Sequence, residues 1–560
     1  MFNFMKMKKI TILALMLSMM IACAKEEEPH SNPMGPTGPT GLTEEVYYEE
    51  VGEVESIGLM EHYELLIQDV TADNAEENAE ANAAFLEYLQ EQLATAEEYT
   101  QECIDQSGAN WSEGSDGETG KNRLLGYEYA TIRYKSIDHK GNPIILSTLV
   151  VWPYNIIFSN PDPNNVIIGC HVTIGSNAER PTNYSKQSIK SDIGMLACCA
   201  KSNNIGTSGV GSSAYENLVI IPDYQGFGAT HGDVHPYLSQ DLTARQVLDG
   251  VRAGIAYYTK NKGTLEKDWR SVSTGYSQGG SVAMAVHRYI EKNNLENEFN
   301  FAGSVCGSGP YDPIATIKSY LNTGYAYMPV AAAMMLYSMV ETNPRLMGKY
   351  KVGDFLSKKF IDSGIIDLIT SKTLNTDQIQ EELLEYSAKF NNGAEEFCME
   401  RKDKKDEYFY PYRKDTKDKY EWAAGYIKTA RANTHDLLEY YTNSYFWKGG
   451  VGINGDYTAA KALYAALEDN ILYRNWNPEH PIFLYHTEDD EVVVIDNYHN
   501  CMKAWKDSDM VKGTIYKGNT KTHVSYGSYF YMLHCGEGIK AIFDNKVDKY
   551  PHSRIDHGDM

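Results

Sequence analysis

The sequence has little positive charge, no paired cysteines of the zinc-binding type and no internal repeat. Its 51 Lys and Arg residues are outnumbered by 76 Asp and Glu residues, which gives a formal net charge of −25. This balance argues against a nucleic-acid partner, because phosphate binding needs a basic surface that releases counterions. None of the 9 cysteines forms a C-x-x-C pair, so nothing points to a structural zinc site. The absence of a repeat argues against a solenoid or propeller.

The sequence also lacks an apolar run long enough to cross a bilayer, although a shorter one lies near the N-terminus. Three lysines at positions 6 to 9 precede the apolar residues 10–20, and Cys23 follows directly after two small or apolar residues. This order resembles a bacterial lipoprotein signal. We therefore expect residues 1–22 to be a signal peptide and Cys23 to carry the lipid that tethers the mature protein to a membrane.

The segment after Cys23 predicts where that tether holds the protein. Residues 24–28 read A-K-E-E-E, which resembles the tag that sends Bacteroidetes lipoproteins to the outer face of the outer membrane. The alternative is an ordinary solvated linker on a periplasmic lipoprotein. Residues up to 43 include a glycine at every third position followed by proline, so we expect 23–43 to form an extended stalk. Residues 44–120 are acidic and predict one or two helices packed on the main domain.

Eight cysteines remain after Cys23, and an even number in an oxidising compartment permits disulfides. Two of them, Cys170 and Cys306, lie in apolar runs typical of strands. We expect these two to be buried thiols rather than bridge partners.

The globular part predicts an α/β fold with a mostly parallel central sheet flanked by helices. Two β-rich runs joined by a Gly- and Pro-containing turn predict an antiparallel hairpin over 127–134 and 144–152. Short apolar strands then alternate with helical patterns, which implies crossover connections. The expected strands are 166–170, 218–222, 271–274, 301–306, 481–486 and 513–517, and the expected helices are 188–199, 241–260, 281–292, 494–505 and 526–543.

A long interruption separates the two parts of this core, which we place at 121–312 and 481–560. Residues 313–480 contain no convincing central strand, yet they include helical patterns over 328–340 and 377–389. An ordinary connection is far shorter. We therefore expect a mostly helical lid or cap over the ends of the strands; the alternative is an independent helical domain.

One motif carries the expected chemistry. Residues 275–280 read G-Y-S-Q-G-G, with a β-prone run before them and a helix-prone run after them. This is the strand, sharp turn and helix that expose a serine hydroxyl above a sheet. Ser277 is the predicted nucleophile, and the glycines suit the strained, crowded backbone of such a turn.

A serine needs a base to take its proton and an acid to orient that base. In folds that expose a serine on such a strand, turn and helix, the acid and then the histidine follow the serine along the chain. Asp490 is the predicted acid, with Asp489 as the alternative one residue away. His523 is the predicted base, because it lies between the last expected strand and the final helix.

The remaining requirement is a pair of donors for the negative charge on the acyl oxygen. The backbone N–H of Gln278, directly after the nucleophile, is one predicted donor. The other is expected in 171–175, H-V-T-I-G, which resembles the H-G-T-x-G loop of lipases. Either Thr173 or Val172 could supply the second amide.

Further segments resemble the secretory lipase family. They are I-I-P-D-Y-Q-G-F-G at 220–228, H-P-Y-L at 235–238 and V-L-D-G-V-R-A at 247–253, together with G-Y-S-Q-G-G and with H-T-E-D-D-E-V-V at 486–493. The resemblance implies an α/β-hydrolase fold, a Ser-Asp-His triad, no cofactor, hydrolysis of carboxylic esters and a lid. Asp223, Tyr224 and Gly228 read as architectural, with a place in the acyl pocket as a second possibility for Tyr224.

The expected activity is therefore hydrolysis of a small-molecule or lipid ester by a serine esterase or lipase. A serine peptidase on the same fold is one alternative, since amides yield to the same chemistry. A surface lipoprotein that uses an inert hydrolase scaffold for binding is another. The acyl and alcohol parts of the substrate stay open, because the insertion that would shape the pocket contains no motif.

Overall fold

A computed structural model describes residues 47–72, 79–108, 124–158, 162–189, 191–201, 216–317, 328–356, 361–382, 399–401, 404–409, 458–517, 522–550 and 552–556. The chain divides into two compact units, Met1–Leu42 and Thr43–Met560. All described residues belong to the second unit. The predicted signal peptide, Cys23 and the whole stalk to residue 43 lie outside the described residues.

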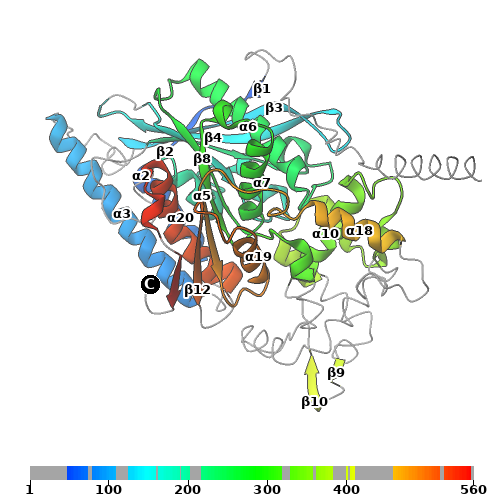
Figure 1. Cartoon of the computed structure of the whole chain (residues 1–560). Helices are drawn as coiled ribbons and strands as arrows, with labels where there is room; N and C mark the ends of the chain where they lie inside the picture. The colour runs from blue at the N-terminus through cyan, green and yellow to red at the C-terminus, as the bar shows by residue number, and fades with distance from the viewer. Residues whose placement is uncertain are drawn as a thin grey trace, which may run out of the picture. The chain divides into compact units, whose positions relative to one another are not determined.

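The core is an 11-stranded mixed sheet (Figure 1) with the order β1-β3-β4-β6-β5-β7-β8-β11-β12-β13, and β2 also pairs with β3. The pairs from β6 to β13 along this order are all parallel, whereas β3 and β4 form the predicted antiparallel hairpin. The prediction of a mostly parallel sheet after a hairpin is confirmed. The strands are β1 (Tyr48–Val51), β2 (Glu55–Gly58), β3 (Leu125–Ile137), β4 (Pro143–Asn155), β5 (Asn165–Cys170), β6 (Asn217–Pro222), β7 (Arg270–Tyr276), β8 (Phe301–Gly307), β11 (Ile482–Thr487), β12 (Val511–Lys517) and β13 (Ser553–Asp556).

Helices cover both faces of this sheet. Successive side chains of a strand point to opposite faces, so a strand that is buried on both sides contributes to two apolar clusters. In β5, Val166 and Ile168 belong to the apolar cluster of one face, and Ile167 belongs to the cluster of the other. The predicted flanking helices are thus confirmed. One face is covered by α6 (Gln240–Asn261), α7 (Gln278–Lys292) and α19 (Asp496–Ala504), and the other by α2 (Leu59–Ala72), α3 (Ala79–Ser107), α5 (Ser191–Cys198) and α20 (Ser528–Phe543).

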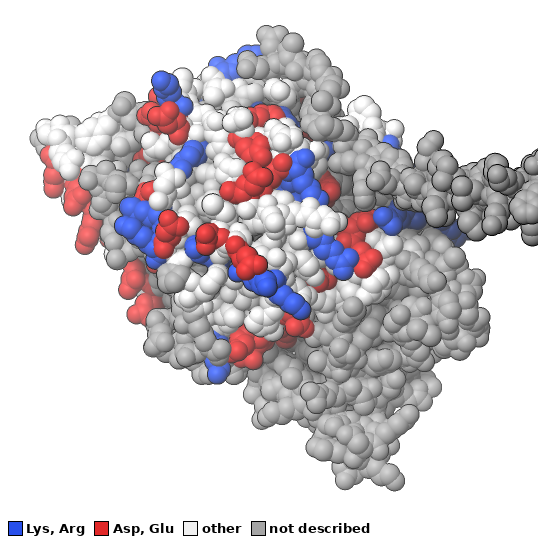
Figure 2. All heavy atoms as spheres, viewed as in Figure 1, with Lys and Arg blue, Asp and Glu red and all other residues white. Residues whose placement is uncertain are grey.

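The prediction of helices alone for 44–120 was incomplete. The segment begins with β1 and β2, which pair antiparallel with β3 before α2 and α3 follow. Four-residue strands with charged side chains have too short an apolar pattern to be recognised, and it is β3 that supplies their hydrogen-bond partners. Helix α3 contains acidic residues and no Lys or Arg, and its acidic side chains line one edge of the molecule in Figure 2.

The described parts of the insertion 313–480 form a separate apolar cluster. It contains α10 (Pro329–Thr342), α12 (Ile365–Ser371) and α18 (Thr458–Asp469), together with Tyr237 and Leu238 of the core. Residues 376–382 are also helical, so the described part of the second predicted helical pattern is present. Two short strands, β9 (Met399–Arg401) and β10 (Lys404–Phe409), pair with each other and not with the central sheet.

Two properties of the described residues bear on the cysteines and on membranes. Seven cysteines are free and buried: Cys103, Cys170, Cys198, Cys199, Cys306, Cys501 and Cys535. Cys170 and Cys306 are therefore buried thiols, as predicted. Within the described part of the chain, none of the helices combines the length and the apolar character that a membrane span requires.

Candidate active site

The carboxyl ends of the parallel strands meet at one edge of the sheet, and the predicted site residues follow four of these ends. Ser277 follows β7, the loop at 171–175 follows β5, Asp490 follows β11 and His523 comes after β12. Ligand sites of open α/β sheets lie outside such strand ends. The sheet topology therefore brings together residues that are far apart in the sequence.

The turn at Ser277 has the strained geometry that its glycines imply. Ser277 has φ 55° and ψ −123° and is the residue from which α7 begins. A Cβ added to Gly279 would lie 2.1 Å from the carbonyl oxygen of Cys170, and one added to Gly280 would lie 2.3 Å from that of Gly307. Only glycine allows α7 to approach the ends of β5 and β8 so closely. The result is a rigid support for the serine side chain.

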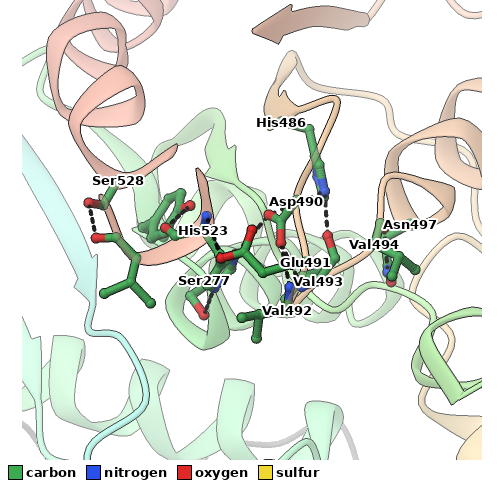
Figure 3. Close-up of polar contacts among 12 residues, drawn as sticks. Ser277, His486, Asp490, Glu491, Val492, Val493, Val494, Asn497, His523 and Ser528 are labelled. Atoms are coloured by element: carbon green, nitrogen blue, oxygen red, sulfur yellow. Dashed lines mark hydrogen bonds and ion pairs between the residues drawn. The ribbon is translucent and has the colours of Figure 1, made fainter. Parts of the chain in front are cut away.

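Ser277, His523 and Asp490 form one continuous hydrogen-bonded chain (Figure 3). The Ser277 Oγ lies 2.8 Å from the His523 Nε2, and the His523 Nδ1 lies 2.7 Å from the Asp490 Oδ2. Both distances are within normal hydrogen-bond range. A carboxylate can only accept, so Nδ1 donates to Asp490 and Nε2 is left to accept the serine proton. This is the tautomer that a general base needs.

Asp490, rather than the alternative Asp489, faces this histidine. Its side chain is fully buried, and its Oδ1 accepts hydrogen bonds from the backbone N–H of Val492 at 3.0 Å and of Val493 at 2.7 Å. Asp489 is exposed. Two backbone donors on one oxygen leave the other directed at His523, which stabilises the charged carboxylate in that orientation.

The imidazole of His523 is held in an environment that favours its protonated form. Burial alone would lower its pKa, but the charge and hydrogen bond of Asp490 and the charge of Glu491 outweigh burial and raise the pKa above its ordinary value. The backbone is fixed as well, since the Tyr276 hydroxyl donates to the His523 carbonyl at 2.6 Å. His523 lies in the π-helical turn Thr522–Gly527 at the start of α20. Sequence analysis missed the contribution of Tyr276, the residue before the nucleophile.

The predicted donors for a developing oxyanion are Gln278, which follows Ser277 directly, and Val172 or Thr173, which line the same cavity. Gln278 is the first residue of α7, where backbone N–H groups have no acceptor within the helix and the helix dipole favours negative charge. Its side chain is buried against His235, with 2.9 Å between Gln278 Nε2 and His235 Nε2. Val172 and Thr173 line the same cavity as Ser277. Val172 has no positive φ, so the backbone at this position does not require glycine.

Tyr224 supports the loop at 171–175 through His171. Its ring stacks on that of His171, with centroids 3.8 Å apart, and its hydroxyl donates to the His171 carbonyl at 3.1 Å. It is buried and is not part of the cavity lining, so the architectural interpretation is the one that the structure favours. Asp223 is architectural too, because it accepts hydrogen bonds from Ser147 and from Thr182.

A cavity of about 670 Å³ opens onto Ser277 and His523. The cap contributes Met328, Ala331, Ala332 and Met335 to its lining, and the core contributes Met195, Leu196 and Met532. Four carboxylates, Asp69, Glu179, Asp192 and Asp377, also line it. The cavity therefore combines large apolar surfaces with a polar region, within the size range of small-molecule sites.

One further cluster among the described residues has the composition of a metal site. His287 Nε2 and His480 Nδ1 each lie 2.8 Å from the Glu291 Oε1, and Trp476 Nε1 lies 2.6 Å from its Oε2. Backbone N–H groups of Glu479 and His480 also donate to this carboxylate. These are direct hydrogen bonds that satisfy Glu291, so we assign no ion to the group.

The fold is similar to that of solved hydrolases. The rice cell wall degrading esterase LipA from Xanthomonas oryzae aligns with a TM-score of 0.51 at 19% sequence identity, over 76% of this chain and 92% of that chain. Lipase A from Candida antarctica in its closed state aligns with a TM-score of 0.47 at 13% identity, over 78% of this chain and 83% of that chain. No family model and no curated protein matches the chain significantly. The resemblance to secretory lipases therefore stays a prediction, whereas the match to LipA shows that the chain has the α/β-hydrolase fold.

Proposed function

We propose that the protein is a serine carboxylic-ester hydrolase that acts through an acyl-enzyme on Ser277. The observation that carries this proposal is the hydrogen-bonded chain from Ser277 through His523 to Asp490, with donor-acceptor distances of 2.8 and 2.7 Å. The cavity at Ser277 adds support, since it is large and mostly apolar. The fold match to a protein described as an esterase agrees with it.

In the first half-reaction, His523 Nε2 takes the proton from the Ser277 Oγ as this oxygen bonds to the ester carbonyl carbon. The carbonyl oxygen becomes negatively charged and accepts the backbone N–H of Gln278 and a second amide from Val172 or Thr173. The carbon–oxygen bond to the alcohol then breaks, and His523 gives its proton to the departing alcohol. The acyl group stays on Ser277.

In the second half-reaction, His523 takes a proton from water while the water oxygen bonds to the acyl carbon. The bond to the Ser277 Oγ breaks, the acid leaves, and the proton on His523 returns to Oγ. Asp490 stabilises the imidazolium at both stages and keeps its own charge.

The test uses p-nitrophenyl esters of short and medium acyl chains with the purified protein. Ser277→Ala is expected to abolish turnover while the circular dichroism spectrum is unchanged. Ser528→Ala is the matched control, because Ser528 lines the same cavity and its hydroxyl donates to the Val524 carbonyl. Turnover that survives in Ser277→Ala, or turnover of peptides but not of esters, would contradict the proposal.

We also propose that Cys23 is lipidated and tethers the enzyme to the outer membrane, on its outer face. The order of lysines, apolar segment and cysteine supports it. Mass spectrometry of protein from membranes is expected to find diacylglycerol on Cys23, and Cys23→Ala is expected to move the protein to the aqueous phase of a detergent partition. Protease treatment of whole cells distinguishes the outer face from the periplasmic one.

A further inference from the structure

His486 is a buried histidine that the mechanism above does not use. It lies in β11, four residues before Asp490, and its side chain has no solvent exposure. Figure 3 shows its imidazole directed at the turn that carries Asp490, with a hydrogen bond to Val493. The sequence predicted no role for His486 beyond its place in the segment 486–493.

The contact with Val493 fixes the tautomer of this imidazole. His486 Nε2 lies 2.8 Å from the Val493 carbonyl oxygen, and a carbonyl oxygen can only accept. Nε2 therefore carries the hydrogen, and Nδ1 is the unprotonated nitrogen. Nδ1 is buried and has no hydrogen-bond partner among the described residues. Burial lowers the pKa of His486, which agrees with a neutral ring.

Val493 connects His486 to the carboxylate of Asp490. Val493 accepts from His486 through its carbonyl and donates to the Asp490 Oδ1 through its N–H. In addition, His486 Nε2 lies 3.7 Å from the Asp490 Oδ2, the oxygen that accepts from His523. This distance is too long for a hydrogen bond, so His486 acts on Asp490 through Val493 and through its position beside the carboxylate.

We propose that His486 is a positioning residue for the hydrolytic site. It holds the turn from Asp490 to Val493 so that one carboxylate oxygen stays on the backbone amides and the other stays on His523. The inference rests on the proposed function, because the orientation of Asp490 matters only if His523 acts as a base. In this role His486 makes no direct contact with the substrate.

Titratable groups act on the imidazoles of both His486 and His523. His486 interacts electrostatically with Asp490, His523 and His499, and His523 interacts with Asp490 and Glu491. Loss of the correct Asp490 orientation would weaken the interaction that raises the pKa of His523. The pH below which activity falls would then move to a lower value, because His523 must be unprotonated to accept the serine proton.

The test compares His486→Leu with His486→Gln by the pH dependence of kcat/KM on a short-chain ester. Gln can place an N–H close to where His486 Nε2 lies, whereas Leu cannot. In His486→Leu we expect kcat to fall on the order of 10- to 100-fold, as for misplaced catalytic groups, with KM little changed and the acidic limb at lower pH. His486→Gln is expected to recover most of the lost kcat and the original acidic limb.

His62→Leu is the matched control, because His62 is also fully buried, has its pKa lowered by burial and has one ring nitrogen without a partner. It is expected to keep the wild-type kcat and acidic limb. If His486→Leu behaves like His62→Leu while the wild type is active, the inference is wrong and the proposed function stands. If the folded wild type hydrolyses no ester, both are wrong. An equal loss in Leu and Gln variants with an unmoved acidic limb would show a merely structural role.

Discussion

The strand ends of the core and the helices of the cap contribute to the same cavity in different ways. The core presents Ser277, His523 and Asp490 from three separate strand ends and fixes each by backbone contacts. The cap presents Ala331, Ala332 and Met335 from one helix, with no polar contact to those three residues in the described part of the chain. We infer that the strand ends of the core determine whether an ester is hydrolysed and that the cap, together with α5 and α20, determines which ester enters.

This difference predicts two kinds of variant. A change in the core is expected to lower turnover of every ester by a similar factor, because it alters groups that act on the ester bond itself. A change in the cap is expected to alter the ratio between esters, because it alters the space around the acyl or alcohol part. A core variant that changed selectivity, or a cap variant that lowered all rates equally, would break the comparison.

The largest expected effect is that of Asp490→Asn. The amide cannot hold His523 in the tautomer with hydrogen on Nδ1, so kcat is expected to fall on the order of 10⁴-fold, as it does in a well-characterised serine protease. Removing the carboxylate also removes the charge that raises the pKa of His523. The residual activity should therefore have its acidic limb at lower pH than the wild type, as measured by kcat/KM against pH.

The matched control for this substitution is Asp489→Asn. Asp489 is the exposed neighbour of Asp490, so its amide variant is expected to keep kcat within about twofold. An Asp489→Asn variant that lost activity while Asp490→Asn kept it would exchange the two assignments.

A smaller effect is expected from Gly279→Ala, which tests the rigid support of the serine. The added Cβ would lie 2.1 Å from the Cys170 carbonyl oxygen and 2.8 Å from that of His171, and these backbone atoms cannot move without displacing the oxyanion loop. We expect a loss of roughly 1–3 kcal/mol in the free energy of unfolding and on the order of 10²-fold in kcat for all esters. Urea unfolding and ester kinetics measure the two losses.

Gly232→Ala serves as the control for this prediction, because a Cβ at Gly232 has no atom within 4 Å and the residue has no positive φ. Its free energy of unfolding is expected to change by less than about 1 kcal/mol. Equal stability of the two variants would show that the approach of α7 to β5 is not tight.

The smallest effect on rate, but the clearest on selectivity, is expected from Ala332→Trp in the cap. The indole would fill part of the cavity that α10 lines. We expect kcat/KM for long acyl chains to fall about tenfold relative to acetate, measured over a series of acyl lengths. Tyr337→Trp, on the same helix but outside the cavity lining, should leave the profile unchanged. If Ala332→Trp does not change the dependence of kcat/KM on acyl length, the cap does not determine substrate choice.

The same contrast explains what could be predicted from the sequence. The core follows local rules: apolar runs mark β5 to β8, glycines mark the turn at Ser277, and the order of acid and histidine along the chain points to Asp490 and His523. The apolar runs and the glycine turn are local signals, and the order of acid and histidine is a rule of the fold that needs no side-chain contact. They also gave the correct sheet type and both helical layers.

Other features depend on partners that are distant in the sequence. β1, β2 and β13 are short and charged and gain their hydrogen bonds only from the strand beside them. The supporting contacts of Tyr276 and His486 depend on side-chain directions that no motif encodes. The cavity in turn combines residues from α10 with residues from α5 and α20, so its shape could not be read from the insertion alone.

The most direct test of the account is the reaction of the protein with a fluorophosphonate. Attack by the Ser277 Oγ on phosphorus expels fluoride, and His523 accepts the serine proton. Peptide mass spectrometry is predicted to find one phosphonyl adduct on Ser277 in the wild type, none in Ser277→Ala, and slower labelling in Asp490→Asn. A folded wild-type protein that remained unlabelled, or that was labelled at another serine, would contradict the account.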